Sequence, residues 1–194
     1  MEAIETRYRS HTCGQLRASD AGKEVRLSGW VHNYRDHGGV VLIDLRDRDG
    51  LTQVVFYSDV CGQATHDEAR KLRSEWVISV AGKVVERGLD EKTGKPRVNP
   101  KLATGEVELM VTSMDVLSVS PTPPFLPDEH ETVHEEKRLT YRYLDLRRPA
   151  MQHTLRVRSR VTRIMRDYLQ DRGFLEIETP MLTKSTPEGS RDFI

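Results

Sequence analysis

The side chains best suited to chemistry in this sequence are an apolar group, an amide and a guanidinium that lie close together in its first third. They are Leu42, Gln53 and Arg35. An apolar surface can pack on an unpaired base, while an amide and a guanidinium can hydrogen-bond to it. The sequence therefore favours reading of unpaired bases. In the alternative interpretation these are ordinary strand residues, and the arginine is a solvated hairpin residue paired with Asp36.

Residues 25–57 must position these three side chains. Apolar and polar residues alternate with a period of two in three runs of this stretch, which is typical of half-buried strands. His37-Gly38-Gly39 and Asp49-Gly50 separate the runs, and both sequences favour hairpin turns. We expect a meander with the apolar group and the amide on the face opposite the core. The guanidinium is expected in the adjoining loop.

The residues that follow predict the rest of a small barrel. Strong helix formers predict a helix over 64–74, and apolar runs predict strands over 76–85 and 106–111, with 115–119 as a candidate extension of the latter. Five strands with a helix between the third and fourth are the signature of an OB-fold barrel, which binds oligonucleotides on its second and third strands. For residues 13–16 a short helix and a short strand fit equally well.

A proline-rich segment, 121–127, predicts a stiff spacer and a domain boundary. We expect a barrel domain over 1–120, a linker and charged connector over 121–148, and the start of a second domain over 149–194. Within the second domain, apolar residues recur at helical spacing over 151–170, with Pro149 in the first turn. A short strand over 174–179 is expected next.

Composition narrows the class of protein. The 30 basic and 30 acidic residues give zero net charge, which argues against sequence-blind binding of nucleic acid. No apolar run is long enough for a membrane span, and the polar N-terminus argues against a secretory signal. The two cysteines, Cys13 and Cys61, form no metal-binding spacing. We therefore expect a cytoplasmic protein with free thiols and no membrane partner.

Four segments, in this order, resemble a known family: GWVHNYRDHGG, IDLRDRDG, RLTYRYLDLRRP and GFLEIETPMLTKSTPEGSRDF. The family is bacterial aspartyl-tRNA synthetase, and the resemblance runs from Cys13 to Ile194. The asparaginyl and lysyl enzymes of the same class II subgroup match TPEGSRD less well. The resemblance implies a mainly β fold. A five-stranded OB-fold anticodon-binding barrel is followed by a linker and the first helix and strand of an α+β class II catalytic core.

The resemblance also implies the activity of a longer parent protein. The family's full enzyme is a homodimer that joins aspartate to tRNA with ATP and Mg²⁺. Its first motif, which builds the dimer interface, matches 151–179 and Pro180. The second and third motifs would lie beyond Ile194. We therefore expect an N-terminal fragment without catalytic residues or metal ligands, which binds no ATP or Mg²⁺ itself and cannot aminoacylate alone.

Three residues match the family's contacts to the tRNA anticodon stem-loop: Arg35, Leu42 and Gln53. The family usually has an aromatic residue in place of Leu42, so stacking on a base is expected to be weaker here. Glu188 matches a residue that contacts the aspartate substrate, at its ammonium group. The alternative for Glu188 is an exposed turn residue.

The resemblance further concerns the choice between two tRNAs. Histidine at the position of His37 is associated with enzymes that charge both the aspartate and the asparagine tRNA, and Gly94 is a second position tied to this choice. The two anticodons differ only in the third base, so one side chain can change the selectivity. The alternative for His37 is a surface histidine in a glycine turn.

A rival hypothesis is a non-enzymatic, free-standing OB-fold factor that binds tRNA or single-stranded nucleic acid. Such a factor has no use for the helix and strand of the synthetase core, so residues 150–194 would then pack within the monomer. On that helix Arg156, Arg160 and Arg163 form either a surface for the tRNA backbone or, as charged flanks usually do, a solvated face.

Overall fold

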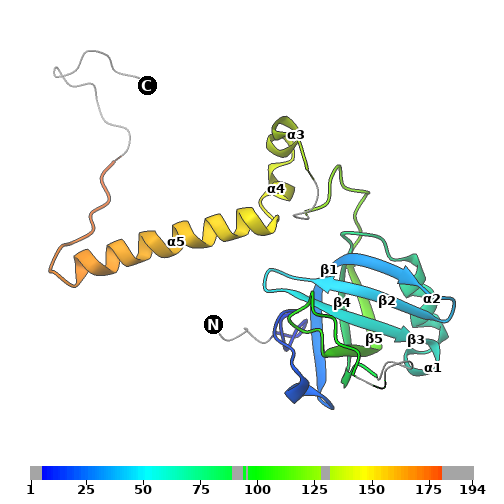
Figure 1. Ribbon diagram of the computed structural model, residues 1–194. Helices are drawn as coiled ribbons and strands as arrows, with labels where there is room; N and C mark the ends of the chain where they lie inside the picture. The colour runs from blue at the N-terminus through cyan, green and yellow to red at the C-terminus, as the bar shows by residue number, and fades with distance from the viewer. Residues whose placement is uncertain (1–5, 89–93, 95, 128–131, 181–194) are drawn as a thin grey trace, which may run out of the picture. The chain divides into compact units, whose positions relative to one another are not determined.

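A computed structural model describes residues 6–88, 94, 96–127 and 132–180 of the chain. The chain divides into two compact units, Met1–Pro124 and Phe125–Ile194. The first unit is built on β-strands, and the second contains the helices α3, α4 and α5 (Figure 1).

Within the described residues, five strands close a barrel in the order β1-β2-β3-β5-β4. Neighbouring strands are antiparallel except β3 and β5, which pair in parallel at Val54–Leu109 and Val55–Met110. This arrangement is an OB-fold, which confirms the predicted fold class. The strands are β1 (Glu24–Asp36), β2 (Val40–Arg46), β3 (Leu51–Tyr57), β4 (Val77–Glu86) and β5 (Val107–Ser118).

The barrel core forms because alternate residues of each strand point inward. On β2 and β3 the inward residues have no exposed surface: Val41, Ile43, Leu45, Thr52, Val54 and Phe56. Burial of a large apolar side chain contributes about 1.5–3 kcal/mol, so this interior stabilises the sheet on which any site must rest. The expected extension of the fifth strand is confirmed, since β5 is continuous to Ser118.

The segment before β1 is hydrogen-bonded to the turn between β2 and β3 and to the start of β3. The N–H of Cys13 donates to the carboxylate of Asp47 at 2.8 Å, and the hydroxyl of Thr52 donates to the carbonyl of Cys13 at 2.6 Å. Gly14 and Gly50 meet at this crossing, where a Cβ added to Gly14 would lie 2.1 Å from the Asp49 carbonyl oxygen. Residues 13–16 are neither helix nor strand, and a 3₁₀ turn, Ala18–Asp20, follows.

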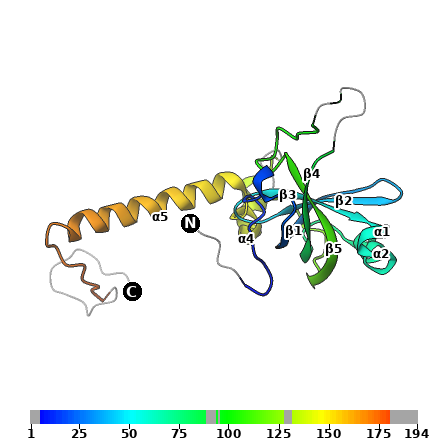
Figure 2. The ribbon, with the colours of Figure 1, turned by 90° about the horizontal axis from the view of Figure 1, so that it is seen from below.

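Two helices connect β3 to β4: α1 (Ser58–Cys61) and α2 (Gln63–Lys71). Figure 2 shows both at one end of the barrel. They confirm the expected helical connection, which ends earlier than predicted because Leu72 turns to an extended backbone and buries its side chain in the core. His66 of α2 is also buried, and neither ring nitrogen has a hydrogen-bond partner among the described residues.

The second unit begins with two short helices, α3 (Glu135–Thr140) and α4 (Arg142–Asp145). The stretch expected to be a linker and connector thus contains two short helices. Asp145 has no exposed surface, and arginines from both helices bind it: Arg138 Nε at 2.8 Å and Arg142 through Nη1. The hydrogen bond from Arg138 is the main cause that lowers the pKa of Asp145 below its usual value.

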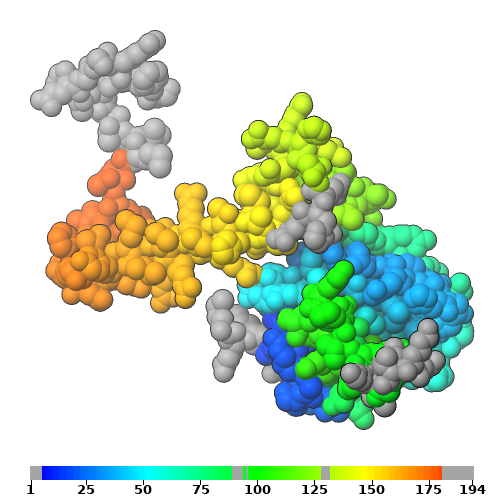
Figure 3. All heavy atoms as spheres, viewed as in Figure 1, coloured from blue at the N-terminus to red at the C-terminus, as the bar shows by residue number. Residues whose placement is uncertain are grey.

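The predicted long helix is confirmed as α5 (Pro149–Gln170), with its proline in the first turn. No residue of α5 is buried, and Figure 3 shows its side chains (yellow to orange) standing out along a single rod. Its apolar residues are 40% to 60% exposed: Leu155, Val157, Val161, Ile164, Met165, Tyr168 and Leu169. The strand expected over 174–179 does not form, because these residues have no strand to pair with among the described ones.

Candidate nucleic-acid interface

The side of β1, β2 and β3 that faces away from the core carries polar and apolar side chains in rows. One row runs from Asn33 through Asp44 to Gln53, and the next from Arg35 through Leu42 to Val55. A third row, from Trp30 through Arg46 to Leu51, lies at the end of the sheet. We call the surface formed by these three rows the outer face. Leu42 and Gln53 lie on it, on the side of the sheet that the sequence predicted.

Asp44 organises the middle of the outer face. Its two carboxylate oxygens accept hydrogen bonds from Arg35 Nη2 at 2.9 Å and from Asn33 Nδ2 at 3.1 Å. Asp44 is 8% exposed, whereas the Arg35 side chain is 45% exposed. A guanidinium held at one end by a buried carboxylate can present its other N–H groups to a base edge or a phosphate.

The expected position of Arg35 was wrong, and so was the partner that the alternative interpretation gave it. The residue lies within β1, opposite Leu42, and not in the first loop. Its partner is Asp44, while Asp36 instead binds Arg70 Nε at 3.0 Å. The reason is that β1 continues well beyond its last regular apolar position, so the hairpin begins after Asp36.

Gln53 lies deeper than a strand residue on an open face would. It is 7% exposed, and its Nε2 donates to Glu108 Oε2 at 3.2 Å. With the amide nitrogen used in this way, Oε1 is the atom suited to accept a hydrogen bond from a base. Burial is the main cause that raises the pKa of Glu108, and the nearby Arg87 and Arg97 oppose it.

Leu42 supplies the apolar part of the outer face. It is half-buried between Arg35 on β1 and Val55 on β3. A leucine in this position offers a small contact area for a base but no aromatic ring. The arrangement therefore has a guanidinium, an apolar side chain and an amide from three adjacent strands, which is the chemistry needed to hold a splayed base.

Sequence reasoning missed three residues of this arrangement: Asn33, Asp44 and Glu108. Asp44 could have been found, because it is a polar residue inside an apolar strand run. Asn33 and Glu108 carry no such signal, since their positions depend on strand register and on pairing between β3 and β5.

The hairpin between β1 and β2 places His37 beside this face. His37 is exposed, and its N–H donates to the carbonyl of Val40 at 3.1 Å. Asp36 fixes the hairpin, because its carboxylate accepts the N–H of Gly38 at 2.9 Å as well as the guanidinium of Arg70 on α2. The hydrogen bond from Gly38 is the main cause that lowers the pKa of Asp36.

The other predicted positions lie elsewhere. Gly94 is exposed in the segment between β4 and β5, with a φ of +65°. Pro180 is exposed at the end of the described chain, and Glu188 lies outside the described residues. None of the described helices is long and apolar enough to cross a membrane. In the same residues, no group of three acidic, histidine or cysteine side chains could hold a metal ion.

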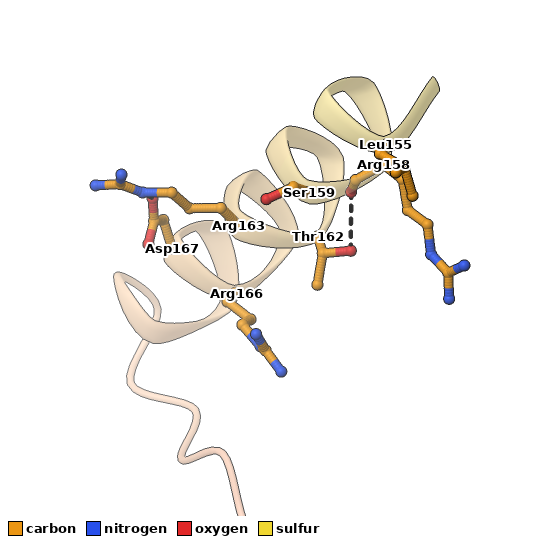
Figure 4. Close-up of a pocket in the computed structure, with 7 residues that line it drawn as sticks. All are labelled: Leu155, Arg158, Ser159, Thr162, Arg163, Arg166 and Asp167. Atoms are coloured by element: carbon orange, nitrogen blue, oxygen red, sulfur yellow. Dashed lines mark hydrogen bonds and ion pairs between the residues drawn. The ribbon is translucent and has the colours of Figure 1, made fainter. Parts of the chain in front are cut away.

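A hollow of about 560 Å³ runs along α5, but its chemistry is less suited to a ligand. Its guanidinium groups belong to Arg158, Arg163 and Arg166, and Figure 4 shows them spread apart and not convergent. Arg163 is paired with Asp167 at 3.4 Å. Convergent groups are a mark of a binding site, so the outer face is the better candidate.

Comparison with protein-family models identifies both units. Residues 25–117 match the OB-fold nucleic acid binding domain, and residues 134–194 match the class II tRNA synthetases of the D, K and N group. The chain is therefore homologous to class II tRNA synthetases, with a nucleic-acid-binding barrel ahead of the synthetase segment.

Among individual proteins, the chain is similar to bacterial aspartate–tRNA(Asp/Asn) ligases. The chain is 52% identical over 194 residues to the ligase of Moorella thermoacetica. This match covers all of this chain and 31% of the relative. It is 54% identical over 187 residues to the ligase of Protochlamydia amoebophila, and this match covers 96% of this chain and 30% of the relative. The chain thus spans less than a third of the length of these relatives.

A solved structure of a tRNA synthetase is also similar to this chain. Asparaginyl-tRNA synthetase from Pyrococcus horikoshii, complexed with asparaginyl-adenylate, superposes with a TM-score of 0.76 at 27% identity. The match covers 97% of this chain and 39% of that one.

Proposed function

We propose that this chain is the anticodon-reading part, and the start of the catalytic domain, of an aspartate–tRNA ligase. The observation that carries the proposal is the outer face, where Arg35, Leu42 and Gln53 project from three adjacent strands around the buried Asp44. The relatives at about half identity, all aspartate–tRNA(Asp/Asn) ligases, support it. The partner is the anticodon stem-loop of a tRNA, whose unstacked bases can reach such a face.

Joining aspartate to tRNA is proposed for the whole protein, as a cytoplasmic homodimer that uses ATP and Mg²⁺. We propose that other residues of the whole protein bind ATP and Mg²⁺. We assign the barrel to tRNA recognition. Glu188 is proposed to bind the substrate ammonium group, and Pro180 to lie in the dimer interface.

The exposed apolar residues of α5 favour this function over a free-standing nucleic-acid factor. A complete small domain rarely leaves such a stripe uncovered, because large exposed apolar patches mark interaction surfaces. In a synthetase the rest of the catalytic domain and the second subunit would cover α5.

The test is binding of the 194-residue chain to a labelled RNA hairpin with the aspartate anticodon, GUC, measured by fluorescence anisotropy. We expect Arg35→Ala and Gln53→Ala each to weaken binding about 5- to 150-fold, since each removes a base contact worth roughly 1–3 kcal/mol. Arg166→Ala makes the same charge change on α5 and serves as the control, for which we expect no effect. Equal affinity for a hairpin with a changed central base would refute anticodon reading.

We also propose that the protein accepts both the aspartate and the asparagine tRNA, as the names of its relatives indicate for them. His37, exposed at the hairpin beside the outer face, and Gly94 are the residues proposed to relax the choice. The chain is then expected to bind GUC and GUU hairpins with similar affinity. His37→Leu is expected to favour GUC. A strong preference for GUC in the unsubstituted chain would contradict this proposal but not anticodon reading itself.

A further inference from the structure

One extra residue in β1 decides which of its side chains reach the outer face. Val31 points into the core and pairs with Leu45, whereas the next pair is Asn33 with Asp44, so His32 is a β-bulge. Side chains alternate along a strand. Without the bulge, the alternation that buries Val31 would also turn Asn33 and Arg35 toward the core.

A strained residue on another segment holds this bulge in place. Glu75, just before β4, has a φ of +66° and is the one non-glycine residue with a positive φ in the described part of the chain. Its N–H donates to the carbonyl of Val31 at 2.8 Å, and the N–H of Val31 donates to the carbonyl of Trp76 at 2.8 Å. These bonds fix the strand immediately before the extra residue.

The side chain of Glu75 binds the same place a second time. Its two carboxylate oxygens each lie 2.9 Å from Arg46 Nη2, and the pair is nearly buried, with 3% and 13% of the side chains exposed. Arg46 Nη1 lies 3.0 Å from His32 Nδ1, and its guanidinium carbon lies 5.8 Å from the centre of the Trp30 ring. The strained residue, the neighbouring strand and the extra residue thus form one cluster.

The combination of strain and a buried ion pair points to a role beyond stability. Glycine would adopt a positive φ at this position without strain, so the backbone alone does not require glutamate. Strained residues persist where the surrounding structure holds them, and they gather at functional sites. At the other end of the bulge, Asn33 and Arg35 are the two residues that bind Asp44.

We propose that Glu75, through Arg46, is a positioning residue for nucleic-acid recognition: it fixes the bulge at His32 and so directs Asn33 and Arg35 to the outer face. The inference rests on the proposed function, because it assigns a role to the same surface. Glu75 itself touches no nucleic acid in this scheme.

The test compares Glu75→Gly with Arg35→Ala and with the double variant in the hairpin-binding assay. Glu75→Gly removes the ion pair and relieves the backbone strain of the positive φ. If the glycine variant does not fold, Glu75→Gln replaces it in the test, because it keeps the size of the side chain. We expect at least a tenfold loss of affinity for Glu75→Gly, and no further loss when Arg35→Ala is added. Glu68→Gln, which removes an exposed ion pair on α2, is the control.

A merely structural role predicts a different result. Glu75→Gly would then lower thermal stability but leave the affinity of the folded fraction unchanged, or its effect would multiply with that of Arg35→Ala. Either result overturns the proposal. If the unsubstituted chain does not bind the hairpin, the proposed function fails. The bulge itself is then tested by NMR, where loss of the Asn33–Asp44 pairing in Glu75→Gly supports the inference and its persistence refutes it.

Discussion

Phe56 in the barrel and Ile164 in α5 are large apolar side chains in opposite surroundings. Phe56 has no exposed surface, whereas Ile164 is 58% exposed. The difference extends to the units around them, since the barrel encloses a cluster of buried apolar residues and α5 buries none of its own. One unit therefore derives its stability from its own core, while the other exposes its apolar side chains.

The largest expected effect tests that difference directly. Phe56→Ala is expected to destabilise the chain by about 3–5 kcal/mol, because it leaves a cavity in a closed core. Ile164→Ala, the matched truncation on α5, is expected to change stability by no more than about 0.5 kcal/mol. Urea unfolding is followed by tryptophan fluorescence for the barrel, where both tryptophans, Trp30 and Trp76, lie, and by the helical signal in circular dichroism for α5. Similar losses of stability in the two variants would contradict the difference in packing between the barrel and α5.

The second effect concerns the crossing of Gly14 over the turn at Gly50. Gly14→Ala would place a methyl group against the Asp49 carbonyl, so we expect a loss of about 1–3 kcal/mol from overpacking. Gly88→Ala is the control, since a Cβ at Gly88 meets nothing within 4 Å. An unchanged urea midpoint for Gly14→Ala would mean that the N-terminal segment is not locked to the turn.

A third substitution is expected to stabilise the barrel. His66 is buried with no hydrogen-bond partner for its ring among the described residues, and an unpaired buried polar group is costly. His66→Leu is therefore expected to raise stability by about 1 kcal/mol. His153→Leu on the exposed surface of α5 is the control and is expected to have no effect. A destabilised His66→Leu variant would show that the imidazole makes a contact of its own.

The smallest expected effects concern how the stability of each unit depends on pH. The pKa of Asp145 is lowered, so its contribution is present above the ordinary value of about 3.9 and is lost as the pH falls through the lowered value. The pKa of Glu108 is raised by burial, so its contribution is present below about 4.3 and is lost as the pH rises through the raised value.

We accordingly expect Asp145→Asn to reduce the acid sensitivity of the helical signal in circular dichroism. Glu108→Gln is expected to stabilise the barrel slightly at neutral pH, and urea midpoints measured across the pH range check it. At neutral pH, Asp145→Asn should lower stability and Glu108→Gln should raise it. A change of stability in the same direction for both would contradict the opposite pKa shifts of the two carboxyl groups.

Most of the barrel could be predicted from the sequence, because period-two patterns and glycine turns are local signals. The bulge at His32 could not, since it depends on Glu75, which is distant in the sequence. For that reason Arg35 was placed in a loop and Asn33 was overlooked. The burial of Gln53 against Glu108 depends in the same way on the pairing of β3 with β5.

The strand expected over 174–179 failed for a related reason. A strand exists only with a neighbour, and its sequence pattern says nothing of where that neighbour is. Helix α5, whose hydrogen bonds are internal, was predicted almost to the residue.

The parallel contact between β3 and β5 has a consequence for how the barrel assembles. Only two residue pairs join these strands, and α1, α2 and β4 come between them in the chain. Contacts between distant parts of a chain form late, because the entropy of closing the loop must be overcome first. Ring closure is thus the expected last step of folding. Successive N–H groups of a strand point to opposite neighbours, so the β3 amides that face β5 should be the first in the sheet interior to exchange with solvent when the ring reopens.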